Sequence, residues 1–359
     1  MFNYVFGIKD IIIIILLLII FFPFKKLKSL LVKNKVDEEK FKHDVNMDTY
    51  LKNKNEIDLI IKKDIKTEFG NEKKMRKLIK YSLDDGKRVR GVIISAIFKQ
   101  LSKQDEIPDY VKEAILTMEY IHAASLIIDD MMDGDTDRRG KKCIHIKYGS
   151  TMAQLVALQL ISLCYQKLCC SINLLNKQMK DSNKNICLIL NTHIANNLKS
   201  LSIGQYIDIN IPNDISKIGK SIKETVHHKQ LLDVEDLIHK KTSSLFMISF
   251  VWPWLLYHNS KTDEELDEDI KNISEIAKLF GLIFQIADDF EDEIQDYKKQ
   301  GKNSVMNYVI YHGKETAKVK YYQFVDKFFT LSEKNNILTQ EIREIISYLN
   351  SKVDHYSKL

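Results

Sequence analysis

The chain has 359 residues, 45% of them hydrophobic, so it carries enough apolar material to bury a large core. Only 12 glycines and 4 prolines occur, which argues against a sandwich or barrel with many tight turns and favours an all-α fold. Lys plus Arg exceed Asp plus Glu by 54 − 49 = 5, and no basic stripe interleaved with aromatic residues is present, so no nucleic-acid partner is expected. Five cysteines without CxxC spacing indicate free thiols in a reducing compartment.

The first 35 residues form a hydrophobic segment with a basic flank. Residues 11–22 are an unbroken apolar run, and residues 4–24 reach the roughly 20 residues of a membrane span if Lys9 and Asp10 lie near one interface. No small-residue cleavage site follows, and the first arginine is Arg76, which disfavours a signal peptide and an ordinary transit peptide. We therefore expect an N-terminal hydrophobic helix that anchors the protein to a membrane.

Lysines gather on the C-terminal side of this helix, and the positive-inside rule then keeps the main domain in the cytosol. We expect the endoplasmic reticulum membrane, with a bipartite signal for an organelle such as a secondary plastid as the alternative. The lysines are Lys25, Lys26, Lys28, Lys33 and Lys35.

Residues 36–47 are mostly polar and are interpreted as a linker, and residues 48–359 as one large helical domain. Strand-like alternation is scarce in this part, and no repeat of solenoid type is visible. Apolar positions three and four apart predict helices over residues 50–65, 111–128, 152–168, 186–198, 231–256, 270–293 and 337–348.

Two clusters of acidic residues lie in apolar, helix-like sequence about 160 residues apart: Asp129-Asp130-Met131-Met132-Asp133 and Asp288-Asp289-Phe290-Glu291-Asp292. Residues i and i+4 share a helix face, so like charges in each cluster repel by a few tenths of a kcal/mol. One acidic patch is usually a solvated helix face. Two patches, each after an apolar run and each accompanied by basic residues, indicate a bound cation. Mg²⁺ fits, because it takes one or two carboxylates and completes its shell with waters and phosphate oxygens.

Basic residues accompany both clusters. Lys87, Arg88 and Arg90 precede the first cluster, and Arg138 and Arg139 follow it. Guanidinium and ammonium groups are natural ligands of diphosphate. Two anions can therefore be held, one bridged through Mg²⁺ and one gripped directly. The segment His239-Lys240-Lys241-Thr242-Ser243 interrupts a long apolar helix, where a lysine is costly unless an anion pairs with it.

From about residue 48 to the C-terminus, the sequence resembles the trans-isoprenyl diphosphate synthase (polyprenyl synthetase) family, and the geranylgeranyl diphosphate synthases in particular. The motifs that carry the resemblance occur in the family's order. They are Gly-Lys-Arg-Val-Arg at 86–90, Ser-Leu-Ile-Ile-Asp-Asp-Met-Met-Asp at 125–133, Arg-Arg-Gly at 138–140, His145 with Tyr148-Gly149, Gly204-Gln205, Lys241-Thr242, and Phe-Gln-Ile-Ala-Asp-Asp-Phe-Glu-Asp at 284–292.

The resemblance implies helices of the isoprenoid synthase type around a deep central apolar cavity, and a homodimer. It implies head-to-tail (1′-4) condensation of isopentenyl diphosphate with allylic diphosphates (dimethylallyl, geranyl or farnesyl diphosphate). The allylic diphosphate would ionise with the help of Mg²⁺, with three ions per active site. The product would be an all-trans prenyl diphosphate.

The resemblance also assigns residues. Asp129, Asp133 and Asp288 would bind Mg²⁺, and the full catalytic set would be Asp129, Asp130, Asp133, Asp288, Asp289, Asp292 and Lys241. The allylic diphosphate would be held by Arg138, Lys241, Thr242, Gln285 and Lys302, with Lys298 or Lys299 as alternatives to Lys302. Isopentenyl diphosphate would be held by Lys87, Arg90, His122 and Arg139. The sequence departs from the family pattern at Gly91, where proline is usual, and at Cys143, where proline or threonine is common.

The residues one and two turns before Asp129 are expected to set the product length. Each helical turn rises about 5.4 Å, close to one isoprene unit. Ala124 and Ser125 are small, so no aromatic plug stops growth at the first turn, and Tyr120 and Ile121 could form the floor one turn deeper. We predict geranylgeranyl diphosphate (C20), with a longer-chain product or farnesyl diphosphate as alternatives.

Three rival functions are considered. A non-catalytic subunit that modulates a partner enzyme would be expected to have lost one aspartate cluster or its basic partners, and here both are intact. A squalene or phytoene synthase is disfavoured by the Lys87 and Arg90 element and by the form of both aspartate motifs. A terpene cyclase would leave the second basic site idle.

Overall fold

The computed structural model describes residues 45–179, 185–218, 234–300 and 307–358. Met47–Leu359 form one compact unit. The predicted N-terminal anchor (1–35), most of the predicted linker (36–47) and Lys302 lie outside the described residues, and so does the start of the helix predicted over 231–256.

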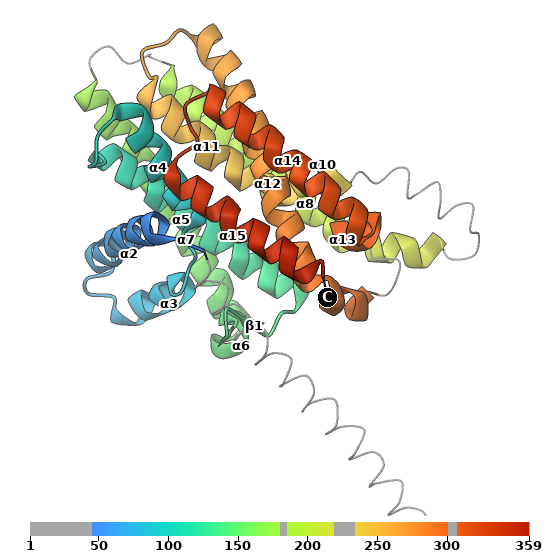
Figure 1. Cartoon of the computed structure of the whole chain (residues 1–359). Helices are drawn as coiled ribbons and strands as arrows, with labels where there is room; N and C mark the ends of the chain where they lie inside the picture. Colours follow the sequence, from blue (N-terminus) through green and yellow to red (C-terminus); the bar gives the residue numbers. More distant parts are fainter. Residues whose placement is uncertain (1–44, 180–184, 219–233, 301–306, 359) are drawn as a thin grey trace, which may run out of the picture. The chain divides into compact units, whose positions relative to one another are not determined.

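The fold prediction of an all-α domain is confirmed, since helices make up nearly all of the described chain (Figure 1). The helices in chain order are α2 (Asp48–Glu68), α3 (Lys73–Leu83), α4 (Val89–Ser102), α5 (Asp109–Asp133), α6 (Ile144–Tyr148), α7 (Ser150–Gln178), α8 (Ile186–Ile218), α10 (Val234–Ile238), the π-helix η1 (His239–Ser243), α11 (Ser244–Tyr257), α12 (Asp263–Gln300), α13 (Tyr308–His312), α14 (Lys314–Lys334) and α15 (Gln340–Tyr356). Strands β1 (Asp137–Arg138) and β2 (Lys141–Lys142) form a small antiparallel hairpin.

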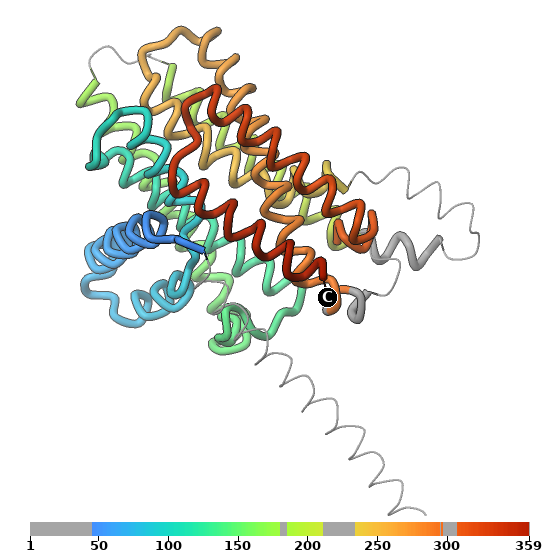
Figure 2. The backbone as a smooth tube through the Cα atoms, in the orientation of Figure 1, coloured from blue at the N-terminus to red at the C-terminus, as the bar shows by residue number. Residues whose placement is uncertain are grey.

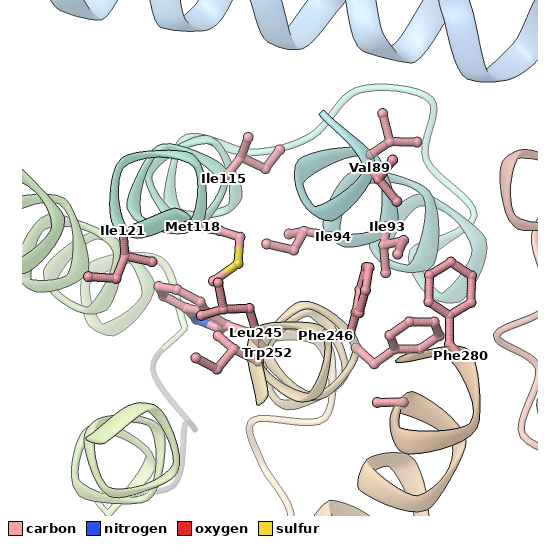
Figure 3. Packing of buried hydrophobic residues seen from close by; sticks show 14 of the residues in the cluster. Val89, Ile93, Ile94, Ile115, Met118, Ile121, Leu245, Phe246, Trp252 and Phe280 are labelled. Carbon is pink, nitrogen blue, oxygen red and sulfur yellow. The ribbon is translucent and has the colours of Figure 1, made fainter. Parts of the chain in front are cut away.

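Helix α11 lies at the centre of the core and packs against α4, α5, α8 and α12. Its sequence is apolar on all sides, as expected for a helix without a solvent face. Figure 3 shows Leu245, Phe246 and Trp252 of α11 facing side chains of α4 and α5. Phe246 and Phe280 of α12 meet edge to face, with ring centroids 4.9 Å apart. This packing fixes α11 and α12 relative to each other, and both carry residues of the predicted site.

The first and last long helices of the described chain, α2 and α15, pack on each other (Figure 2). Glu344 of α15 accepts a hydrogen bond from the backbone N–H of Tyr50 at 2.8 Å, and Glu341 accepts one from the Asn53 amide. The Glu344 carboxylate thus satisfies orphan backbone donors at the start of α2, and Glu341 holds the Asn53 side chain.

As far as their residues are described, most helices predicted from apolar spacing fall within an observed helix or series of helices. The prediction over 337–348 is wrong at its start, because α15 begins at Gln340 after Thr339, whose hydroxyl caps Ile342 N. Helices α3, α4 and α14 were not singled out by apolar spacing. In α4 most residues are buried, so it lacks the broad polar face that makes a period visible.

Among the described helices, α7 alone is long and apolar enough to cross a membrane by length and composition, and half of its most apolar stretch is buried inside the protein. That test is also passed by core helices of soluble proteins. Helix α7 packs most extensively on α5, which carries the first aspartate cluster.

Candidate active site

A cavity of about 860 Å³ opens between the second half of α5, the start of α4, the π-helix η1 and the middle parts of α8 and α12. This volume lies in the range of small-molecule sites. Its polar lining includes most of the predicted site residues, namely Lys87, Arg90, His122, Ser125, Asp129, Arg138, Arg139, Lys241, Thr242, Gln285, Asp288 and Asp292. Its apolar lining includes Ala123, Leu126, Ile128, Leu198, Leu201, Leu245 and Phe284. One cavity thus brings residues of both aspartate clusters together with residues of the basic motifs.

The first aspartate cluster forms the last turn of α5, which ends at Gly134 in the left-handed conformation (φ +69°). The C-terminus of a helix carries a partial negative charge, and this last turn contains no basic residue. Carboxylates there are therefore disfavoured by the helix itself. The aspartates need cations from outside α5.

Two of the predicted allylic ligands supply those cations. Arg138 lies 3.5 Å from the Asp129 carboxylate and also pairs with Asp130. Lys241 lies 3.5 Å from the other Asp129 oxygen and also pairs with Asp208 of α8. Both cations line the cavity, so a bound diphosphate can replace Asp129 as their partner.

Asp130 and Asp133 lie away from the lining of this cavity. Asp130 is buried and held by Arg138 and by the Cys143 thiol, which donates a hydrogen bond to it. Asp133 is exposed and accepts a hydrogen bond from the Gln205 amide at 3.4 Å. Desolvation of its carboxylate by the surrounding protein and the neighbouring Asp129 raise the pKa of Asp133, as expected for two like charges one turn apart.

Lys241 and Thr242 lie in a π-helical turn between α10 and α11, so the predicted interruption of the apolar helix is one wide turn of the same helix. Such turns are frequent at functional sites. Two glycines hold it from either side. A Cβ on Gly204 of α8 would lie 2.7 Å from Lys241 N, and a Cβ on Gly281 of α12 would lie 2.8 Å from Ser243 Cα. Close backbone approach therefore requires glycine at both positions.

Thr242 and Gln285 are connected to the second aspartate cluster. The Thr242 hydroxyl donates to Gln285 Oε1 at 2.7 Å, and Gln285 Nε2 donates to Asp289 Oδ1 at 2.8 Å. The other Asp289 oxygen accepts from the backbone N–H of Tyr308 at 2.7 Å. Burial raises the pKa of Asp289 to about 8. Asp289 lies outside the cavity lining and joins η1, α12 and α13.

Asp288 and Asp292 are the residues of the second cluster that line the cavity. The Asp288 carboxylate is paired with Lys352 of α15, which also pairs with Glu291. Burial alone would raise the pKa of Asp288, but Lys352, Lys87 and Arg90 outweigh it, and the pKa lies below its ordinary value. Asp288 is thus held as an anion.

The predicted isopentenyl diphosphate ligands form a basic corner of the cavity, made of Lys87, Arg90, His122 and Arg139. Arg90 lies over the Phe246 ring, 4.3 Å from its centroid, and its Nη1 is 3.3 Å from His122 Nε2. Within the described chain, neither Lys87, Arg90 nor Arg139 forms an ion pair, and the buried atoms Arg90 Nε and His122 Nδ1 have no hydrogen-bond partner. Burial and the nearby Arg90 hold the pKa of His122 well below its ordinary value. A cationic corner with unused donors suits an anionic ligand.

Arg88 of the same motif has a different environment. It is buried, pairs with Asp58 at 2.9 Å and with Glu119 at 3.2 Å, and adopts a left-handed backbone conformation (φ 58°). Glu119 also accepts a hydrogen bond from the backbone N–H of Gly91 at 3.1 Å. Arg88 and Glu119 therefore shape the loop that presents Lys87 and Arg90.

Of the four residues expected to set the product length, Ser125 alone lines the cavity in the described part of the chain. Ala124, Tyr120 and Ile121 are packed in the core, and the Tyr120 hydroxyl bonds to Asp64 of α2. The predicted floor thus lies within the helix packing, and Ser125 is the one of the four whose side chain borders the cavity in the described chain.

Several residues of the site were not predicted from the sequence. None of Asp208, Lys352, Tyr50 and Gly281 is singled out in the sequence analysis. Tyr50 donates a hydrogen bond to the Lys87 carbonyl oxygen, and so it fixes the loop of the basic corner. None of them belongs to a local charge pattern, so single-sequence reading offers no signal for them.

The donors present fit Mg²⁺. Asp129, Asp288 and Asp292 offer carboxylate oxygens, which are the hard ligands that Mg²⁺ prefers. No group of three or more His, Cys, Asp or Glu side chains close enough to hold a metal is found among the described residues. An ion that uses one or two carboxylates and takes its other ligands from water and phosphate needs no such group.

The family model described as polyprenyl synthetase matches residues 72–324. The chain belongs to the polyprenyl synthetase family. The family prediction is thereby confirmed, and with it the coarse enzyme class of prenyltransferase.

Similar proteins come from a virus, an archaeon and a plant. A trans-prenyltransferase of African swine fever virus (isolate Warthog/Namibia) is 30% identical over 272 residues, which cover 74% of this chain and 72% of the relative. A short chain isoprenyl diphosphate synthase of Methanocaldococcus jannaschii is 30% identical over 309 residues, 82% of each chain. The mitochondrial geranylgeranyl pyrophosphate synthase 10 of Arabidopsis thaliana is 30% identical over 239 residues, 65% of this chain and 62% of the relative. For further viral trans-prenyltransferases, the match spans 62% to 63% of their length.

Solved structures of low sequence identity share the fold. A geranyltranstransferase of Thermotoga maritima superimposes with a TM-score of 0.63 at 19% identity, covering 86% of this chain and 99% of that one. A geranyltransferase of Legionella pneumophila gives a TM-score of 0.61 at 18% identity, covering 87% and 97%. The isoprenoid synthase fold expected from the sequence is confirmed.

Proposed function

We propose that this chain is a prenyl diphosphate synthase that condenses isopentenyl diphosphate head to tail with an allylic diphosphate. The observation that carries the proposal is the set of charged residues that line one cavity. The lining contains the carboxylates of Asp129, Asp288 and Asp292 with the cations Arg138 and Lys241, and it also contains the basic corner of Lys87, Arg90, His122 and Arg139. This lining suits two diphosphate groups. One would be bound through metal ions on the carboxylates, and the other would be bound directly by lysine and arginine side chains.

The reaction requires that an allylic C–O bond breaks while the carbon partner leaves as a cation, and the barrier lies in separating these charges. Arg138 and Lys241 are already positioned near Asp129 and stabilise negative charge as it develops on the departing diphosphate. Thr242 and Gln285 add hydrogen-bonding groups beside it. Mg²⁺, when bound to the aspartates, supplies Lewis-acid stabilisation of the same charge.

Arg90, Lys87 and Arg139 bind the second diphosphate and orient the isopentenyl double bond for attack. The apolar lining, which includes Leu198, Leu245 and Phe284, keeps water from the carbocation and accepts the prenyl chain. No side-chain nucleophile is required, and we propose that the released diphosphate takes the final proton.

The test is a product assay with purified protein, Mg²⁺, an allylic diphosphate and labelled isopentenyl diphosphate. We expect chain elongation that stops when EDTA is added. Omission of isopentenyl diphosphate must abolish turnover, because a terpene cyclase or a head-to-head enzyme would still consume the allylic substrate. Absence of any condensation would favour a non-catalytic partner subunit.

We propose geranylgeranyl diphosphate as the main product, with a longer chain as the second candidate and farnesyl diphosphate as the third. The absence of an aromatic side chain at Ala124 and Ser125 supports this order. Ser125→Phe should shorten the product, because Ser125 lines the cavity, and Ala124→Phe is the comparison at a position packed in the core. A main product of C15 or C40 from the unaltered chain would contradict the C20 proposal.

We also propose a homodimer. Leu155, Leu158 and Tyr165 follow one another at helical spacing on α7 and are each more than 40% exposed, which supports a contact with a second copy. Leu158→Glu should shift the mass measured by light scattering from dimer to monomer. An unchanged dimer would place the interface elsewhere.

The membrane anchor in residues 1–35 and its endoplasmic reticulum location remain part of the proposal. An anchored enzyme would release a lipophilic product next to a bilayer. A fluorescent reporter fused to the first 47 residues distinguishes the endoplasmic reticulum from an organelle such as a secondary plastid, and a diffuse cytosolic signal would contradict an anchor.

A further inference from the structure

We propose that Lys352 of the C-terminal helix is a built-in counter-cation that keeps the second aspartate cluster formed when no metal is bound. The inference rests on the proposed function, since it assigns the metal-binding role to Asp288. Lys352 would then be a positioning residue that links α15 to the metal site.

The contacts of Lys352 are unusual for a lysine. Its side chain is 4% exposed, and its ammonium group pairs with Asp288 at 2.5 Å and with Glu291. A lysine buried to this degree is stable only when it is paired. Its two partners lie three residues apart on α12, so one ammonium group neutralises two carboxylates that would otherwise repel each other.

The position of Lys352 separates it from the diphosphate ligands. Arg138 and Lys241 line the cavity, where a phosphate can reach them, whereas Lys352 does not. The Lys352 ammonium group donates a hydrogen bond to Asp288 Oδ1, and the described residues donate no hydrogen bond to Oδ2 of the same carboxylate. Asp288 lines the cavity and so retains an oxygen for a ligand there.

The neighbourhood explains why a permanent cation is needed. Further carboxyl groups, those of Glu291, Asp292 and Asp296, lie around this part of α12, and Lys87 and Arg90 also act on the charge of Asp288. Without Lys352, the acidic residues of α12 would depend on bound metal for their compensation. The chain instead keeps this wall ordered between turnovers, when metal and diphosphate have left.

The experiment compares the full chain with Lys352→Met, which keeps the side-chain length and removes the charge. Melting temperatures are measured in EDTA and in Mg²⁺ with inorganic diphosphate. In EDTA we expect the variant to melt about 5 °C or more below the unaltered chain. With Mg²⁺ and diphosphate, at least half of that loss should be recovered, so the ligand-induced shift is larger in the variant.

Two further variants complete the design. Lys318→Met removes an ion pair that α15 makes through Asp354, at 2.9 Å, and it should leave the ligand-induced shift at the value of the unaltered chain. Lys352→Met with Glu291→Gln removes one negative charge together with the positive one and should restore much of the melting temperature in EDTA. If Lys352→Met alone does not fold, recovery of a folded double variant still supports the proposal.

Equal ligand-induced shifts in Lys352→Met and the unaltered chain would overturn the inference, as would a double variant that is no more stable than Lys352→Met. These outcomes are independent of whether the unaltered chain condenses isopentenyl diphosphate. Failure of the inference is therefore distinguishable from failure of the proposed function.

Discussion

One cavity contains two regions that differ in whether their charged groups are already paired within the chain. The acidic wall consists of Asp129, Asp288 and Asp292, and the basic corner consists of Lys87, Arg90, His122 and Arg139. In the acidic wall, Asp129 and Asp288 are already paired with cations of the chain. In the basic corner, the cations have no carboxylate partner among the described residues, and buried donors point to no acceptor there. The acidic wall must exchange partners when ligands bind, whereas the basic corner is ready for an anion as it is folded.

The largest expected effect tests the acidic wall. Asp129→Ala and Asp288→Ala should each lower kcat by about 10² to 10³, because each loses an electrostatic group that acts on the departing diphosphate. KM for isopentenyl diphosphate should stay nearly unchanged in both variants, since the basic corner remains intact. Steady-state kinetics measures both constants. Condensation at full rate in either variant, or in EDTA, would remove the functional difference between the two regions.

A second prediction concerns the π-turn that carries Lys241 to the acidic wall. Gly281→Ala places a Cβ 2.8 Å from Ser243 Cα, so the turn must move. We expect a loss of about 1–3 kcal/mol in the free energy of unfolding, as for overpacked cores, together with a lower kcat. Denaturant titration and kinetics measure both.

Gly70→Ala is the matched control for Gly281→Ala, because its added Cβ meets only an ordinary contact at 3.6 Å. If both alanine variants were equally stable and active, close packing of α12 on η1 would not position Lys241.

The basic corner predicts a dependence of stability on pH. The pKa of His122 is held well below 6.5 in the fold by burial and Arg90, so below pH 6.5 the unfolded chain takes up a proton that the folded chain refuses. Stability should therefore fall as pH drops from about 7.5 to 5, by at most about 1.4 kcal/mol per pH unit from this group. His122→Gln, which does not titrate, should flatten this slope in denaturant titrations at several pH values. Parallel slopes would show that His122 takes up its proton without hindrance.

The smallest effect is expected from Tyr50→Phe. The variant loses the hydrogen bond from the Tyr50 hydroxyl to the Lys87 carbonyl oxygen. Such a bond contributes a net free energy of about 0.5–1.5 kcal/mol, so KM for isopentenyl diphosphate should rise about two- to tenfold. KM for the allylic substrate should stay constant.

Tyr321→Phe removes another buried hydroxyl, one that bonds to Asn350, and should change neither KM. A rise in both KM values in Tyr50→Phe would mean that the loop carrying Lys87 serves the whole cavity rather than the basic corner.

Much of the site was predictable because its signals are local. Asp129 and Asp133, or Lys241 within an apolar helix, stand out from their immediate neighbours. Helix α2, whose apolar residues share one face, was found for the same reason, whereas the buried α4 was not. Lys352 lies 64 positions from Asp288, and the pairing of the two depends on how α15 packs on α12.

Product-length residues illustrate the same limit. Counting turns back from Asp129 places Ala124 and Ser125 at one depth, but only the packing of α5 decides that Ser125 faces the cavity while Ala124 is covered. Likewise, the basic segment at 239–243 was visible as an interruption, but its π-helical turn and its contact with Gly281 follow from tertiary structure.

Gly91 has a practical consequence for engineering. Its N–H donates to Glu119, and a Cβ there would lie 3.0 Å from that carboxylate. A proline imported with a relative's basic loop would remove the donor and add a ring at the same point. Chimeras between this chain and its relatives will therefore tolerate the exchanged loop only if position 119 is exchanged with it.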